Sequence, residues 1–301
     1  MTDKKTVAEA VIIIPHYNDP ARLRLCLETL LPQALENGVD IVVVDNASTV
    51  DLSAVKADFA SVTFLHQAEK GPGPARNLGV TSTTHPRLFF TDSDCVPDDN
   101  WVAVALAQGP EDKITGGPVE TFDETPRPRS GAQAFETVFA FPFEDYVKRL
   151  KFTGTGNMIT TRAVFEATGP FEGGVFEDKD WCLRAGALGY VVHYAPDLLV
   201  WHPTRDDFAG LRRKWQANVR VSFFRNGDGF VDRLRWAGRA LAVAASAFVH
   251  LPKVFRHPAL SPGERWPAAR TLLQLRLLRA GWMLRQSVSP PKRKSEGRLY
   301  D

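Results

Sequence analysis

The chain has 301 residues, of which 44% are hydrophobic and 24% charged, a composition typical of a globular protein that buries an extensive core. Its three cysteines, Cys26, Cys95 and Cys182, are too few and too scattered for a disulfide framework or a zinc site. The N-terminus is too polar for a signal peptide, and the longest apolar run, at 240–251, is too short to cross a bilayer. We therefore expect a cytoplasmic protein.

Charge is distributed unevenly along the chain, although the net charge is only +2. From Arg205 to the end there are 20 Lys and Arg against 7 Asp and Glu, a balance of +13, whereas the preceding residues hold 17 against 28, a balance of −11. Such a split indicates a basic appendage with an anionic partner, or simply a solvated basic surface. A nucleic-acid partner is not expected, because no motif that reads nucleic acid accompanies the charge.

Strands and helices alternate along the first hundred residues. Apolar runs that end in polar or turn residues predict buried strands, at 9–15, 39–45, 61–67 and 87–94. Helical spacing fills the intervals, at 20–35, 51–60, 71–83 and 98–109. This alternation predicts an α/β protein with a doubly wound, mostly parallel central sheet.

Polar residues gather where three of these predicted strands end: at Pro15–Asn18, at Asp45 and at Asp92–Asp94. Ligands of doubly wound sheets bind beyond the carboxyl ends of the strands. Asp92 and Asp94 are one residue apart, so in extended backbone their carboxylates point the same way. Two carboxylates at one point repel unless a proton or a cation lies between them, which indicates a metal site.

The residue composition changes in the second half of the chain. A Phe-rich segment at 131–153 is interpreted as a lid or an acceptor-side insertion, and further strand and helix patterns follow it up to His202. Arginine- and tryptophan-rich helices come next, then a charged tail from about Pro290 that we expect to be disordered. We expect a catalytic domain over 1–205 and a basic helical C-terminal region over 206–301.

Five blocks resemble, in order, those of glycosyltransferase family 2, a group of inverting enzymes with a GT-A fold. They are IIIPHYN, VVVDNAS, GPGPARNLG, FFTDSD and FEDKDWCLR, and the resemblance covers roughly residues 10–205. It implies transfer of a sugar from a nucleotide-diphosphate donor, with a UDP-sugar favoured, to a hydroxyl of a saccharide or lipid-linked acceptor. Cell-surface polysaccharide or glycolipid assembly would be the setting.

The resemblance also implies roles for single residues. The nucleotide sugar would be bound by Pro15, Tyr17, Asp45, Arg76, Asp92 and Ser93. Asp94 and His202 would hold Mn²⁺ or Mg²⁺, which stabilises a departing diphosphate. The alternative role for His202 is that of a histidine at the end of a strand, hydrogen-bonded to the backbone.

On the acceptor side, the attacking hydroxyl must lose a proton, and Asp178 matches the family's catalytic base. Arg184 would orient Asp178 or pair with Asp180, four residues before it. Gly156, Asn157 and Glu177 would lie on the acceptor or sugar side, and the alternative for Asn157 is a buried turn residue.

Other readings stay open. A non-catalytic nucleotide-sugar-binding or scaffold protein would share the fold, and a sugar nucleotidyltransferase would normally carry a Gly-rich loop after the first strand, which PHYNDPARL lacks. The stretch RRKWQ differs from the Gln-x-x-Arg-Trp of processive synthases, which argues against that subclass. The apolar and basic C-terminal helices either lie on an anionic membrane surface, at the inner face of the cell membrane, or pack on protein.

Overall fold

A computed structural model describes residues 8–172 and 176–291; the tail predicted to be disordered lies almost entirely outside these residues. The described chain forms two compact units, one of residues up to 120 with 141–202 and one of 121–140 with 203 onward. Residues 121–140, expected in the catalytic domain over 1–205, belong here with the C-terminal helices.

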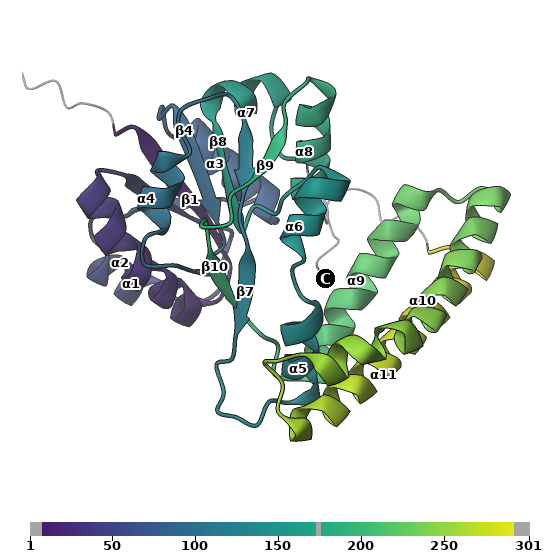
Figure 1. The fold of residues 1–301 in the computed structure, drawn as a ribbon. Coiled ribbons are helices and arrows are strands. Elements are labelled where there is room, and N and C mark those ends of the chain that lie inside the picture. The colour runs from purple at the N-terminus through teal and green to yellow at the C-terminus, as the bar shows by residue number, and fades with distance from the viewer. Residues whose placement is uncertain (1–7, 173–175, 292–301) are drawn as a thin grey trace, which may run out of the picture. The chain divides into compact units, whose positions relative to one another are not determined.

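The first unit is built on a seven-stranded sheet of order β3-β2-β1-β4-β8-β6-β9 (Figure 1). Its strands are β1 (Ala10–His16), β2 (Asp40–Asp45), β3 (Thr63–His66), β4 (Arg87–Thr91), β6 (Ile114–Gly116), β8 (Asn157–Thr161) and β9 (Val192–Tyr194). The four N-terminal strands run parallel, and β8 is antiparallel to both of its neighbours. This arrangement confirms the expected mostly parallel α/β sheet.

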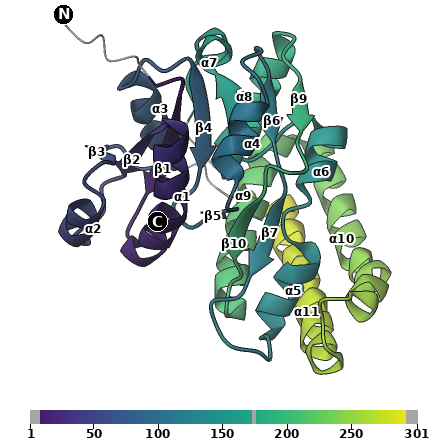
Figure 2. The same cartoon turned by 60° about the vertical axis from the view of Figure 1, so that its left-hand side comes forward.

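Helices cover both faces of this sheet, and alternate residues of β1 show why (Figure 2). Ile12 and Ile14 pack toward α1 (Pro20–Asn37), α2 (Ser53–Asp58) and α4 (Trp101–Ala107). Val11 and Ile13 pack toward α3 (Pro72–Thr81), α7 (Arg162–Thr168) and α8 (Glu177–Ala187). A strand buried on both faces needs apolar residues at every position, which is why its sequence is a continuous run.

Two glycines shape these helices: Gly38 ends α1, and Gly79 allows α3 to pack closely on β1. Gly38 follows α1 in the left-handed region, at φ 65°, where a side chain would be strained. A Cβ at Gly79 of α3 would lie 2.5 Å from Ile13, so this glycine lets the helix pack tightly on β1.

Shorter elements complete the first unit. A small sheet has the order β5-β10-β7, with β5 (Val96–Pro97), β10 (Val200–Pro203) and β7 (Val119–Phe122), the last two continuing into the second unit. The first unit also contains the one-turn helix α6 (Phe143–Asp145) and a π-helical turn, η1 (Tyr146–Leu150).

The second unit consists of α5 (Gly131–Phe139), α9 (Phe208–Asn226), α10 (Phe230–Arg256) and α11 (Pro262–Val288). A core of α5, α9, α10 and α11 side chains forms one of its apolar clusters. Glu136 of α5 is buried and accepts hydrogen bonds from Arg205 and from Lys214 of α9. These contacts explain why 121–140 joins this unit. In the described part of the chain, no helix is both long and apolar enough to span a membrane.

Candidate active site

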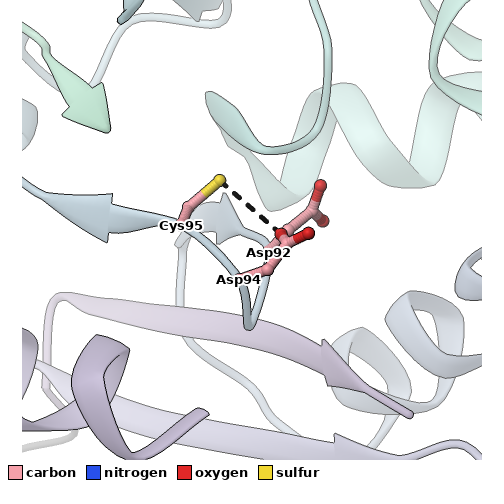
Figure 3. Close-up of side chains that lie close together, drawn as sticks. All are labelled: Asp92, Asp94 and Cys95. Atoms are coloured by element: carbon pink, nitrogen blue, oxygen red, sulfur yellow. Dashed lines mark hydrogen bonds between the residues drawn. The ribbon is translucent and has the colours of Figure 1, made fainter. Parts of the chain in front are cut away.

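The paired acids lie on the turn that follows β4. The strand ends at Thr91, and the backbone N–H of Cys95 donates to the carbonyl of Asp92, at 3.0 Å. One side-chain donor or acceptor atom of each of Asp92, Asp94 and Cys95 lies within 4.8 Å of the others (Figure 3). The two carboxylates therefore gather as expected, but because of a turn and not because of an extended strand.

The residues around this turn suit a hard divalent cation. His202 Nε2 lies 3.4 Å from Asp94 Oδ2, so the structure places the two predicted metal ligands together. Burial, followed by the charges of Asp94 and Asp92, raises the pKa of Cys95 well above its ordinary value and keeps it a neutral thiol. Carboxylate oxygens with one imidazole nitrogen form a donor set for Mn²⁺ or Mg²⁺ more than for a thiolate-binding metal.

Arg76 joins this turn to the start of α8. Its side chain is 3% exposed, and the guanidinium donates to Asp92 Oδ1 at 2.6 Å and to Glu177 Oε1 at 2.7 Å. Although burial alone would lower it, Asp92 and Glu177 raise the pKa of Arg76. Arg76 thus holds two acids from distant parts of the chain, and Glu177 serves as its partner.

Asp178, the predicted base, follows Glu177 directly. Burial, followed by the charge of Glu177, raises the pKa of Asp178 to about 7. Its carboxylate accepts a hydrogen bond from the backbone N–H of Lys179, at 2.6 Å. A carboxyl group with a pKa near neutral can take up a proton under physiological conditions, which is what a general base must do.

The ends of β1 and β2 carry the residues expected to bind the nucleotide. Asp45 ends β2, accepts from the backbone N–H of Ser48 at 3.3 Å and lies 3.4 Å from His66 Nδ1. Tyr17 follows β1, and 48% of its surface is exposed. Lys70 lies over its ring, 5.8 Å from the centroid. An exposed ring and a carboxylate at neighbouring strand ends can contact a flat, polar ligand.

Two other predicted nucleotide residues are less accessible. Pro15 is a buried residue of β1 that pairs with Val44, and Ser93 of the acidic turn is 9% exposed. Their side chains contribute to the shape of the strand ends more than to an exposed surface.

Gly156 and Asn157, predicted on the acceptor side, have different surroundings. A Cβ at Gly156 would lie 3.0 Å from Asp92 Oδ2, so this glycine borders the acidic turn. Asn157 is buried, donates to the carbonyls of Pro118 and Leu198, and accepts from the indole of Trp101. These three bonds use both amide hydrogens and the oxygen inside the protein, which favours the alternative of a buried structural residue.

Arg184 does not contact Asp178. Its guanidinium donates to Asp180 at 3.0 Å and to the backbone carbonyls of Thr168 and Pro170, at 2.7 and 2.6 Å. Of the two roles left open by the sequence, the structure gives it the pairing with Asp180. It fastens α8 to the end of α7, so it supports the helix that carries Asp178.

Three neighbours of the site, Cys95, Lys70 and His66, were not predicted from the sequence. Cys95 directly follows Asp94 and could have been added from its position alone. Lys70 and His66 could be found only through the fold: His66 reaches Asp45 from the end of β3, and Lys70 reaches Tyr17 from the segment between β3 and α3. Lys70 and His66 extend the polar edge formed by the four parallel strands.

Solved structures with the same architecture define the class of this protein as a GT-A fold. One is GalNAc-T7 with UDP, GalNAc and Mn²⁺, at TM-score 0.51 and 16% identity over 67% of this chain and 45% of that chain. Another is Staphylococcus aureus TarS 1–349 with UDP-GlcNAc, at TM-score 0.50 and 14% identity over 94% of this chain and 76% of that one. At these identities the likeness concerns the fold.

The chain belongs to glycosyl transferase family 2, whose family model matches residues 11–168. Glycosyltransferase AglE of Haloferax volcanii is 26% identical over 205 residues, which are 64% of this chain and 66% of the relative. The match therefore spans slightly less than two-thirds of that relative's length. The family and the fold class expected from the sequence blocks are both confirmed.

Proposed function

We propose that this chain is an inverting, metal-dependent glycosyltransferase that moves a sugar from a nucleotide-diphosphate donor, with UDP-sugars favoured, to a hydroxyl acceptor. The main support for this proposal is the cluster in which Arg76 joins Asp92 of the acidic turn to Glu177, the neighbour of Asp178. The buried side chain of Arg76 thereby links Asp92, on the side proposed for the diphosphate, to Glu177, next to the proposed base.

The residues divide the chemistry of such a transfer between them. Asp178 in its ionised form accepts the proton of the acceptor hydroxyl as the oxygen attacks the anomeric carbon, and the bond from that carbon to the diphosphate breaks. Attack on the face opposite the leaving group inverts the anomeric configuration. A divalent cation bound at Asp94, with Asp92 and His202 beside it, would stabilise the negative charge of the departing diphosphate.

Thermal-shift measurements with UDP, GDP, dTDP and CMP test the donor site, each in Mn²⁺, Mg²⁺ or chelator. Ligands that bind the folded state raise the unfolding temperature by mass action. We expect one nucleotide to stabilise the wild type and to lose its effect with chelator or in Asp94→Ala. Asp99→Ala removes an exposed acid of the same segment and is the matched control. A wild type that responds to none of the nucleotides would refute the donor site.

We also propose that α10 docks on an anionic membrane surface, where a lipid-linked acceptor would be presented. Phe230, Leu234, Leu241 and Phe248 are 65–82% exposed and recur at helical spacing. The helix also carries five Lys or Arg residues and the single acid Asp232. An apolar stripe beside basic residues suits the interface of a membrane with anionic lipids.

Flotation with vesicles separates this docking from its alternatives. We expect binding to vesicles that contain phosphatidylglycerol, weaker binding to phosphatidylcholine alone, and loss of binding in Leu241→Ser/Phe248→Ser. Leu35→Ser changes an exposed leucine of α1 and is the control. Equal behaviour of the double variant and the wild type would refute the docking, and a change in oligomeric state in its place would point to a second copy of the chain.

A further inference from the structure

Four aromatic side chains form a continuous strip in the first unit: Phe141, Phe143, Tyr146 and Phe152. The rings of Phe141 and Phe143 are parallel, with centroids 6.1 Å apart. Tyr146 meets Phe143 edge to face at 5.4 Å and stacks on Phe152 at 4.9 Å. Phe141, Phe143 and Tyr146 are only partly buried, so the strip has accessible aromatic surface.

Each end of the aromatic strip meets a part of the candidate active site. At one end, the ring of Phe141 lies 4.8 Å from that of His202, which neighbours Asp94. At the other end, Lys179 Nζ lies 5.0 Å from the centre of the Phe152 ring, and Lys179 directly follows Asp178. The strip therefore runs from His202 to Lys179, each of which is next to a residue of the candidate site.

Gly154 shows how close the middle of the strip comes to Asp178. A Cβ at this glycine would lie 2.7 Å from Cζ of Phe143 and 3.4 Å from Oδ2 of Asp178. The aromatic ring and the carboxylate thus both lie against Gly154, where there is no room for a side chain. A molecule whose hydroxyl reaches Asp178 would have its ring next to Phe143.

The backbone of this segment is irregular. Phe141 and Lys151 have φ of 53° and 58°, in the left-handed region that residues with side chains seldom adopt. Between them, Tyr146–Leu150 forms a π-helical turn, an irregularity frequent at functional sites. Strain of this kind persists where surrounding contacts hold it, and it clusters at ligand-binding segments.

Charges on the same segment are largely neutralised within it. Lys148 pairs with Glu144 and Arg149 with Asp145, each four residues apart. A further cation beside the strip, Lys179, lies over the ring of Phe152. A site for a phosphorylated or carboxylated acceptor would need cations without such partners. The aromatic strip instead offers π faces, whose negative potential attracts the C–H groups on the apolar face of a sugar ring.

We propose that the aromatic strip is the acceptor subsite, and that it takes an uncharged pyranose ring stacked on Phe143 with its hydroxyl directed at Asp178. The proposal rests on the proposed function for its placement beside a catalytic base. Phe143 determines which acceptor is bound and takes no part in proton transfer.

Saturation-transfer NMR tests the subsite without requiring turnover. The probes are the methyl glycosides of glucose, galactose, mannose and N-acetylglucosamine, with open-chain sorbitol as a control, all in the presence of UDP and Mg²⁺. We expect at least one glycoside to receive saturation from the wild type. Phe143→Leu should weaken this binding about tenfold, since an aromatic contact and its buried area are lost. Leu150→Ala, on the same segment but outside the strip, should bind as the wild type does.

Two results would overturn the subsite: no glycoside gives a signal with the wild type, or Phe143→Leu binds as well as the wild type. A thermal shift by UDP, measured on the same samples, tests the donor site separately. If UDP binds and the glycosides do not, the subsite is wrong and the donor site stands. If glycoside binding depends on Phe143 and no nucleotide binds, the subsite stands as a sugar site and the proposed transfer is refuted.

Discussion

Arg76 is the residue whose removal should disturb the site most. Its side chain is 3% exposed, and its partner Glu177 is 9% exposed, so Arg76→Met leaves a carboxylate in the protein interior without its cation. Removing one partner of a buried ion pair costs about 3–5 kcal/mol. Asp92, 36% exposed, is screened by water and adds little to this figure. We expect Arg76→Met to lower the free energy of unfolding by about 3 kcal/mol.

Urea unfolding followed by circular dichroism measures this loss, and two further variants interpret it. Arg76→Met/Glu177→Gln removes the orphaned charge and should recover about 1 kcal/mol or more. Arg24→Met breaks an exposed pair with Asp58 and should cost less than about 1 kcal/mol. If the free energy of unfolding of Arg76→Met is within about 1 kcal/mol of the wild-type value, or if the double variant recovers no stability, the buried ion pair does not organise this site.

Three further predictions follow from other residues. Gly154→Ala should reduce transfer by displacing Phe143 and Asp178, whereas Gly186→Ala, whose Cβ would meet nothing within 4 Å, should leave transfer unchanged; equal rates would contradict the crowding at Gly154. Because burial and Glu177 raise the pKa of Asp178 to about 7, its ionisation costs folding stability as pH rises from about 4 to 7, so Asp178→Asn should gain stability over the wild type across that range in thermal scans. A pH-independent difference would refute that pKa. Burial alone would raise the pKa of Glu136, but Lys214 and Arg205 lower it below its ordinary value. The stability lost in Glu136→Gln should therefore be largest at neutral pH and should shrink as pH falls below about 4.5. A loss of stability that is the same at pH 3 as at pH 7 would contradict this prediction.

The parallel half of the sheet could be predicted because each strand is a local signal. A β1 buried on both faces requires an uninterrupted apolar run, and the polar residues that end β1, β2 and β4 then fall at one edge of the sheet. The gathering of Asp92 and Asp94 was predicted from strand alternation, although a turn produces it. The outcome agreed because either geometry brings residues i and i+2 together.

Contacts between distant residues could not be predicted in the same way. Arg76 and Glu177 are 101 positions apart, and nothing in either segment specifies that one will bury its guanidinium against the other. The role of Asn157 likewise depends on three partners that only the fold brings to it. The π-helical turn within the Phe-rich segment was not predicted either, since π-helices are rare and appear mostly as single turns.

The most direct test of the account compares donor turnover with donor binding in Asp178→Asn. UDP release from UDP-sugars, with water or a glycoside as acceptor, reports turnover, and calorimetry with UDP and Mn²⁺ reports binding. A general base contributes about 10²–10⁴ to the rate, so turnover should fall at least about a hundredfold while UDP affinity stays within about threefold of the wild type. Wild-type turnover in Asp178→Asn would contradict the assignment of Asp178 as the base and, with it, the proposed mechanism.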